Sequence, residues 1–154
     1  MEAWGGPRGE LHDFHLSSFR IEVKTWTNES LPRIFISDPS QIVVDPIFPL
    51  WITAVQLSND TMNGASLPEK SARLLSMMNQ DQKAIYNALL ADAGYLGTGE
   101  ESYTMRYSVH DTVYYLVTEG FPMIDPSTIP AGISNVKYAL DLNALSRFIA
   151  EPQF

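Results

Sequence analysis

Residues 12–26 read HDFHLSSFRIEVKTW, and this stretch decides what fold the chain can adopt. Apolar residues alternate with other residues on both sides of Ser17-Ser18, which is typical of β-strands. Two residues are the commonest connection between the strands of a hairpin, although Ser-Ser is not a favoured pair. We therefore predict a β-hairpin that turns at Ser17-Ser18, so that residue 16 faces residue 19 and residue 13 faces residue 22.

In this register the charges of the stretch gather on one side of the hairpin. Asp13 faces Glu22, with their Cβ atoms roughly 4.5–5.5 Å apart. Lys24 shares that side because side chains of a strand repeat every two residues. The other side carries the apolar residues Phe19, Ile21 and Val23, which predicts that the apolar side faces the core.

Two like charges directly opposite each other destabilise a strand pair, so something is expected to compensate. A divalent cation between Asp13 and Glu22 would do so, and hard oxygen ligands with room for water and phosphate are how Mg²⁺ is held. Lys24 beside such an ion could polarise a water and offset charge on a phosphate. The pattern thus suits phosphodiester hydrolysis. The pattern is loose, however. The alternative interpretation is a solvated strand face on which Glu22 and Lys24 form a weak pair worth at most about 1 kcal/mol.

The rest of the chain alternates between strand and helix patterns. A capped helix start lies at Ser66, and helical spacing continues toward Gly94 with a division near Asn79. Strands are expected at residues 33–37, 49–57, 103–109, 113–118 and 136–142, the second buried on both faces and the third and fourth joined near His110-Asp111. This order predicts a mixed α/β (α+β) fold in a single domain, residues 1–154.

Composition narrows the class of protein. Hydrophobic residues make up 45% of the 154 residues and charged residues 18%, as in a globular protein. There is no cysteine, no apolar run long enough for a membrane span and no apolar signal segment at the N-terminus, so we expect a cytoplasmic protein with no membrane partner. The formal net charge of −8 argues against a chain that binds phosphate backbones on its own.

The opening stretch also resembles the PD-(D/E)xK nuclease superfamily. More narrowly, the chain is similar to the PD-(D/E)xK motif proteins of bacterial phage-defence gene clusters. In that family Trp–x–Gly–Pro and Asp–Phe precede Glu–Val–Lys–Thr, and here these are Trp4–Pro7, Asp13-Phe14 and Glu22–Thr25. The likeness continues through Arg33–Ser37 with Gln41, Pro49–Leu57, Ala93–Leu96, Tyr115–Pro122 and Ile129–Leu142, and so covers nearly the whole chain.

The resemblance implies a restriction-endonuclease-like mixed sheet flanked by helices. It implies that Asp13 and Glu22 are metal ligands, that Lys24 is catalytic and that Gln41 lies near them, positioning a phosphate or the lysine. Mg²⁺ would be the cofactor, with Mn²⁺ as an alternative, and DNA the substrate. Other proteins of a restriction-modification or antiviral defence system would be partners, and a homodimer is left open.

One departure from the family pattern concerns the N-terminus. The family usually carries an upstream helical region, and the superfamily commonly takes a further acidic residue from it. Only eleven residues precede His12, and Gly5-Gly6-Pro7 disfavours a helix. We expect a shortened chain in which Glu10 is a candidate substitute for that acid and His15 a candidate neighbour of Asp13.

Three functions therefore follow from the sequence. The first is a Mg²⁺-dependent DNA endonuclease, or the nuclease component of a defence system. The second is a catalytically inactive scaffold of the same fold that binds partner proteins. The third, an acidic mimic of DNA, ranks last because the acids are spread evenly and interleaved with apolar strands.

Overall fold

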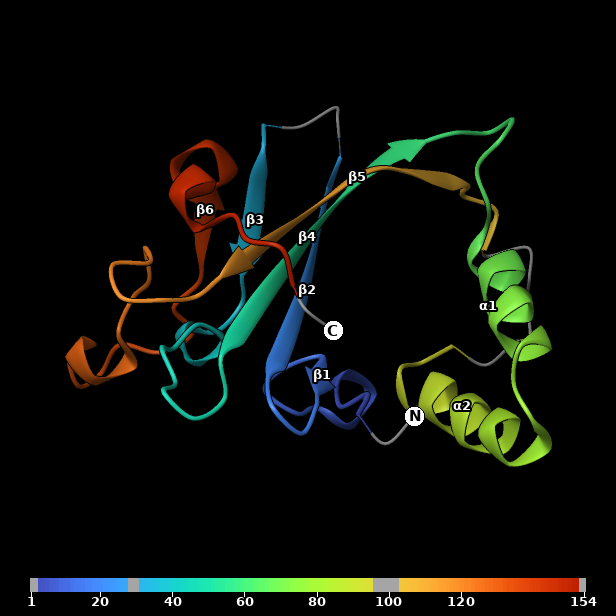
Figure 1. Cartoon of the computed structure of the whole chain (residues 1–154), viewed down its shortest axis with the longest axis horizontal. Helices are drawn as coiled ribbons and strands as arrows, with labels where there is room; N and C mark the ends of the chain where they lie inside the picture. Colours follow the sequence, from blue (N-terminus) through green and yellow to red (C-terminus); the bar gives the residue numbers. More distant parts are fainter. Residues whose placement is uncertain (1–2, 28–30, 96–102, 153–154) are drawn as a thin grey trace.

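The computed structural model describes residues 3–27, 31–95 and 103–152. Along the chain (Figure 1) lie the 3₁₀ turns η1 (Gly6–Arg8), η2 (Pro39–Gln41), η4 (Pro126–Thr128) and η5 (Leu142–Phe148), the helices α1 (Leu67–Ser76) and α2 (Gln80–Asp92), and the strands β1 (Phe14–His15), β2 (Arg20–Thr27), β3 (Arg33–Ile36), β4 (Leu50–Asn59), β5 (Tyr107–Leu116) and β6 (Tyr138–Asp141). The predicted mixed α/β fold is confirmed.

A four-stranded sheet in the order β1-β2-β4-β5 forms the centre of the fold. Strands β2 and β4 are parallel, whereas β1 and β5 pair antiparallel with their neighbours, so the sheet is mixed. Strands β3 and β6 form a separate antiparallel pair. Because β2 and β4 run side by side in the same direction, the segment between them crosses over the sheet and carries β3 and η2 onto one of its faces.

The predicted hairpin is confirmed with its register. Phe14 pairs with Ile21 and His15 with Arg20, and the backbone N–H of Leu16 donates to the Phe19 carbonyl across Ser17-Ser18. Extending this register by one residue sets Asp13 opposite Glu22, as the sequence predicted.

The faces of β2 are the reverse of the prediction. Glu22 is the buried residue of the strand, whereas Ile21 and Val23 are only half-buried. The parallel neighbours of Glu22 and Lys24 are Ile52 and Ala54, both in the hydrophobic core. The charged side of β2 therefore faces inward, and the assumption that the more apolar side must be the inner one was wrong for this strand.

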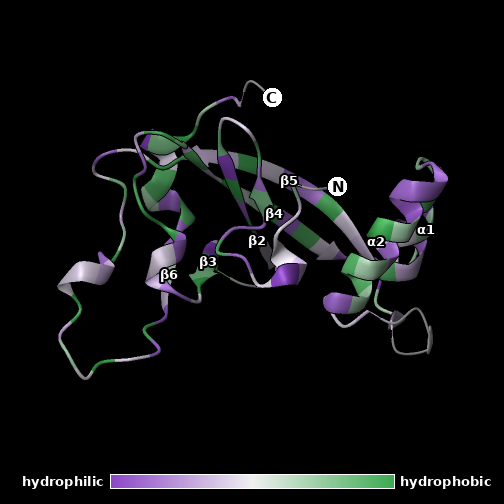
Figure 2. Cartoon of the chain, turned by 90° about the horizontal axis from the view of Figure 1, so that it is seen from below, coloured by the Kyte–Doolittle hydropathy of each residue, from purple (hydrophilic) through white to green (hydrophobic). Residues whose placement is uncertain are grey.

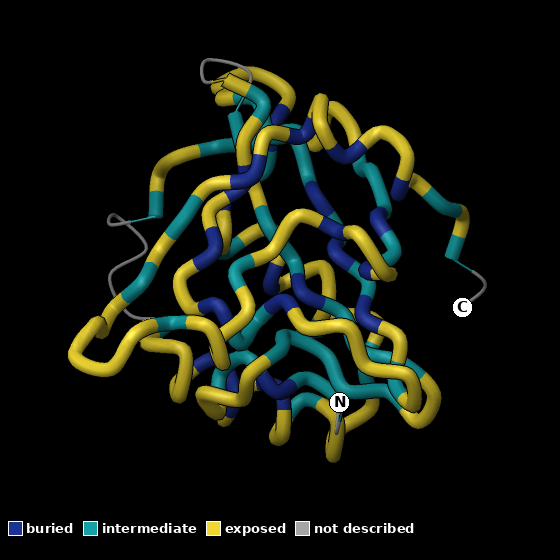
Figure 3. The backbone as a smooth tube through the Cα atoms, turned by 90° about the vertical axis from the view of Figure 1, so that its left-hand side faces the viewer, coloured by how far each residue is buried: buried dark blue, intermediate teal, exposed yellow. Residues whose placement is uncertain are grey.

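The core lies between the four-stranded sheet and the β3–β6 pair. Buried side chains of β4 meet those of β3, β6 and η5, namely Leu50, Ile52 and Ala54 with Ile34, Ile36, Leu140, Leu145 and Phe148. Strand β4 alternates along its first half between buried and half-buried residues, so it is not buried on both faces as predicted. Figure 3 shows the buried positions of the strands interleaved with partly exposed ones, and Figure 2 shows the matching bands of hydropathy.

One predicted hairpin is a single strand. Residues 103–109 and 113–118 were expected to be two strands, but β5 runs unbroken through His110-Asp111. Gln56 pairs with Asp111 and Leu57 with Val109, so His110 is the extra residue of a β-bulge. A bulge accommodates one unpaired residue without reversing the chain, which is why the polar pair does not make a turn.

The two helices lie together at one end of the sheet (Figure 1), and both begin where the sequence predicted. Ser66 caps α1 and Asn79 caps α2, each in a reciprocal capping box. The N-terminal segment packs on α2, where the rings of Trp4 and Tyr86 stack with centroids 5.9 Å apart. Among the described helices, none combines the length and apolar composition that a bilayer crossing requires.

Candidate active site

Glu22 and Lys24 form a buried ion pair on the inner side of β2. Glu22 Oε1 lies 2.6 Å from Lys24 Nζ, and the two side chains are 4% and 14% exposed. The spacing of two residues along a strand brings both onto the same side. The solvated strand face that the sequence left open is therefore wrong, because water reaches neither group freely.

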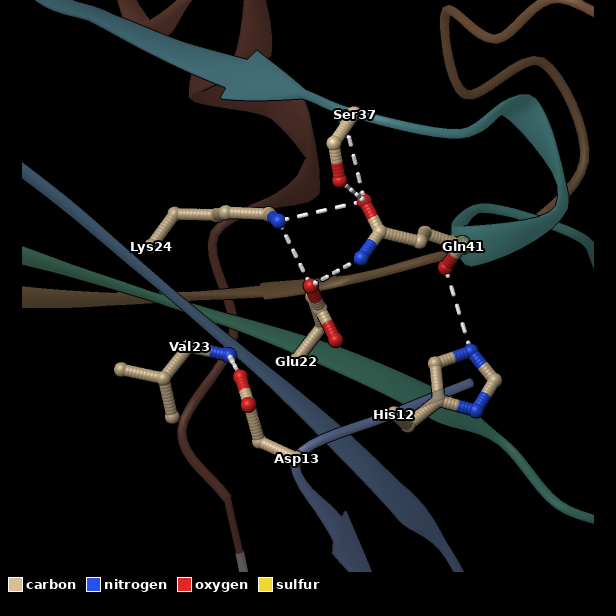
Figure 4. A network of polar contacts seen from close by, with 7 residues as sticks. All are labelled: His12, Asp13, Glu22, Val23, Lys24, Ser37 and Gln41. Atoms are coloured by element: carbon tan, nitrogen blue, oxygen red, sulfur yellow. Dashed lines mark hydrogen bonds and ion pairs between the residues drawn. The ribbon is translucent and has the colours of Figure 1, made fainter. Parts of the chain in front are cut away.

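Gln41 connects the two charges (Figure 4). Its Nε2 donates to Glu22 Oε1 at 2.9 Å, and its Oε1 accepts from Lys24 Nζ at 3.2 Å. Gln41 is the last residue of η2, whose start is fixed by Asp38, the side chain of which accepts from the Ser40 N–H. The short turn after β3 thus delivers the glutamine to the inner side of β2, and the predicted proximity of Gln41 to Glu22 and Lys24 is what the geometry shows.

Two further residues join this cluster that the sequence did not indicate. Ser37 donates to Gln41 Oε1 from both its backbone N–H and its hydroxyl, at 3.2 and 3.0 Å. His12 Nε2 lies 3.1 Å from the Gln41 carbonyl oxygen. His12 precedes β1, which begins only at Phe14, so strand alternation does not set the direction of its side chain.

Asp13 lies beside the cluster and fixes its own position through the backbone of β2. Its Oδ2 accepts from the Val23 N–H at 2.8 Å, and its carbonyl oxygen accepts from the N–H groups of Gly5 and Gly6. A Cβ at Gly6 would stand 2.8 Å from Asp13 Oδ1, so a side chain at this position would require the Asp13 carboxylate to shift. The motif that precedes Asp13, Trp4–Pro7, therefore lies against the aspartate and fixes the position of its backbone.

Burial sets the electrostatics of the site. Removal from water raises the pKa of Glu22, Lys24 opposes this by hydrogen bond and charge, and the Asp13 carboxylate adds to the rise. The pKa of His12 is lowered, first by burial, although its hydrogen bond with Gln41 opposes the shift. In both groups the largest cause is burial, which disfavours the charged form of each and is characteristic of an environment with little water.

The donor set of the site suits a hard divalent ion held by few protein ligands. Asp13 and Glu22 are adjacent enough for the charge of one to raise the pKa of the other. Mg²⁺ is usually bound through one or two carboxylates and completes its shell with water and phosphate oxygens. Within residues 3–27, 31–95 and 103–152, no three His, Cys, Asp or Glu side chains converge, so a site of the Zn²⁺ type is not formed there.

Glu10 and His15 lie together, and the His15 ring is next to that of His12, with centroids 5.8 Å apart. His15 Nε2 is 3.2 Å from Glu10 Oε2, an ion-pair distance without hydrogen-bond geometry. Glu10 also packs over Gly5, where a Cβ would approach its carboxylate to 2.5 Å. Glu10 therefore does not complete an acidic trio with Asp13 and Glu22 in the described residues, and its suggested role as a substitute acid is not supported.

Comparison with known proteins gives one match. The profile of the family DUF4420, described as a putative PD-(D/E)XK family member, matches residues 1–143. No curated protein matches the chain, and no solved structure does. The mixed sheet and its helices are consistent with the restriction-endonuclease-like fold that the sequence motifs implied.

Proposed function

The chain belongs to the DUF4420 family of PD-(D/E)XK-like proteins, and from this premise we propose that it is a metal-dependent DNA endonuclease. The observation that carries the proposal is the buried cluster of Glu22, Lys24 and Gln41 with Asp13 at its side. A buried lysine next to two carboxylates is the set of groups needed to place a divalent ion and a positive charge against one phosphate.

In this proposal each residue has a distinct task. Asp13 and Glu22 would hold Mg²⁺ or Mn²⁺, which when bound would lower the pKa of a coordinated water and neutralise phosphate charge. Lys24 orients the attacking water and offsets the charge that develops on the phosphate. Gln41 holds the Lys24 ammonium and the Glu22 carboxylate in place through its two amide atoms. The water oxygen would form the new bond to phosphorus and release its proton to solvent, while the bond to the leaving sugar oxygen breaks and that oxygen takes up a proton from solvent.

An acidic protein is expected to need partner proteins in order to bind DNA. A net charge of −8 leaves little attraction for a phosphate backbone at long range. We place the protein in the bacterial cytoplasm as one component of a restriction-like defence system whose other proteins supply most of the DNA affinity.

Plasmid nicking tests the proposal directly. Purified protein with Mg²⁺ or Mn²⁺ should convert supercoiled plasmid to open circles, and EDTA should stop it. Asp13→Ala and Lys24→Ala should each lower the rate by about a hundredfold or more. Lys70→Ala, which removes an exposed lysine from α1, is the matched control and should leave the rate unchanged. Nicking that survives EDTA, or that is equal in all variants, removes the nuclease proposal.

A second candidate, an inactive scaffold, is favoured by one observation. The Glu22 carboxylate is already matched inside the chain by Lys24 and Gln41, so the fold needs no metal to balance it. Calorimetric titration with Mg²⁺ separates the two functions. Heat of binding that is lost in Glu22→Gln supports the enzyme, whereas no binding together with co-purification of defence-system proteins supports the scaffold.

A further inference from the structure

A cavity of about 350 Å³ adjoins the candidate active site and contains an unusual arginine. Its walls include His12, Arg20 and Ser40 from around the site and Leu11, Val43 and Phe48 as apolar surface. His12 precedes Asp13 and contacts Gln41, and Ser40 precedes Gln41 in η2. The cavity and the cluster thus share their boundary. Its volume is at the lower end of the range for small-ligand pockets.

Arg20 lies on the same side of β2 as Glu22, two residues earlier. That spacing is about 6.6 Å along a strand. The step is similar to that between neighbouring phosphates of an extended nucleic-acid strand. A strand that follows β2 from a scissile phosphate at Glu22 and Lys24 toward Arg20 would have its next nucleotide at Arg20.

The contacts of Arg20 leave much of its guanidinium available. Nη1 donates to the carbonyls of Leu16 and Phe19 at 2.6 and 3.1 Å, and no salt bridge to Arg20 occurs among the described residues. Its guanidinium carbon stands 4.2 Å from the centre of the Phe48 ring. The Asp45 side chain, which also lines the cavity, accepts hydrogen bonds through Oδ1 from the backbone N–H groups of Ile47 and Phe48. Arg20 therefore stacks on one face of the Phe48 ring, so a further planar group can stack only on an outer face of this pair, and the nearby Asp45 carboxylate interacts with the Arg20 charge.

We propose that this cavity binds the unpaired base of the nucleotide next to the scissile phosphate, an inference that rests on the proposed nuclease function. A base stacks on an aromatic ring or on a guanidinium plane, and either contact tolerates any sequence. A base held within a duplex cannot leave its neighbours to enter such a cavity without unstacking. The substrate class that follows is single-stranded DNA, or a junction that presents an unpaired nucleotide.

Fluorescence of 2-aminopurine tests the inference without cleavage. A short single-stranded thymidine oligonucleotide with one 2-aminopurine is titrated with protein in EDTA, beside the same strand annealed to its complement. The expected result is quenching and tighter binding for the single strand. Phe48→Ala should weaken that binding about fivefold or more, since stacking contributes on this scale for each base. Phe48→Trp should retain the binding. That result would show that the loss in Phe48→Ala comes from the missing aromatic ring and not from an unstable protein.

Phe35→Ala is the matched control, because Phe35 is an aromatic residue 72% exposed on β3 and outside the cavity. Equal binding by wild type and Phe48→Ala, with folded protein verified by circular dichroism, overturns the inference. Cleavage assays on the same single-stranded oligonucleotide, with Mg²⁺ in place of EDTA and the same variants, separate the two proposals. Lys24-dependent cleavage with no effect of Phe48 keeps the nuclease and removes the base pocket, whereas Phe48-dependent quenching with no cleavage does the opposite.

Discussion

Replacing Lys24 with methionine isolates the contribution of the buried ion pair. Methionine keeps most of the apolar stem and removes the ammonium that lies 2.6 Å from Glu22 Oε1. The Glu22 side chain is only 4% exposed, so water cannot take the place of the lost cation. Removing one partner of a buried pair typically costs about 3–5 kcal/mol of folding free energy.

Protonation limits this loss, and the limit depends on pH. The folded variant can neutralise Glu22 by binding a proton, which costs about 1.36 kcal/mol per pH unit above the ordinary carboxyl pKa of 4.5. The part of the loss that comes from the unpaired charge is therefore limited to about 4 kcal/mol at a pH of about 7.5, and falls to below about 1 kcal/mol near pH 5. A raised carboxyl pKa means that the folded state binds the proton more tightly than the unfolded state. Stability from this group is thus present at low pH and lost as pH rises through the folded pKa.

Urea unfolding followed by tryptophan fluorescence, in EDTA and at these two pH values, measures the effect. The exposed pair of Glu69 and Arg106, with side chains 49% and 35% exposed, supplies the control. Glu69→Gln keeps the capping box of α1 and should change stability little at either pH. The double variant Glu22→Gln, Lys24→Met should regain much of the loss. A loss below about 1 kcal/mol at the higher pH, or an equal loss at both, contradicts a buried, ion-paired Glu22.

Three further predictions concern the neighbours of this pair. Gln41→Ala should lower nicking about tenfold or more and raise the Mg²⁺ concentration required, as measured by metal titration of the rate. The pKa of His12 is lowered in the folded protein, so below the ordinary value of 6.5 the unfolded chain binds a proton more readily than the folded protein does. The free energy of unfolding should therefore fall as pH drops through that value. Unfolding curves of His12→Gln should show a smaller fall. Gly6→Ala should displace the Asp13 carboxylate. It should reduce the nicking rate severalfold and change the melting temperature little.

What the sequence predicted well depends on nearby residues. The Ser17-Ser18 turn, its register and the caps Ser66 and Asn79 are each decided within a few positions, where alternation and capping chemistry are informative. The β5 bulge was missed because its local signal, His110-Asp111, is the same as that of a turn. Only the pairing with β4, about fifty residues earlier, decides between them.

The site divides in the same way. Glu22 and Lys24 could be predicted to share a side because they are two residues apart on one strand. The contact of His12 with Gln41 spans 29 residues, and the contact of Gln41 with Glu22 spans 19. Such contacts depend on how β3 and η2 cross the sheet, and no local pattern encodes that path. Gln41 was found only because a family resemblance pointed to it.

The inward face of β2 also bears on the proposed function, because a charged pair is costly at this place in the fold. Ile52 and Ala54 flank Glu22 and Lys24, so apolar residues on β2 would extend the core at these positions. Burial raises the pKa of Glu22 even with Lys24 present, which means that its charge is less stable inside the protein than in water. Replacement of such a pair by apolar residues is often neutral or stabilising. Folding alone therefore gives little reason for a charged pair at these positions, which supports the proposal that the pair serves a metal-dependent reaction.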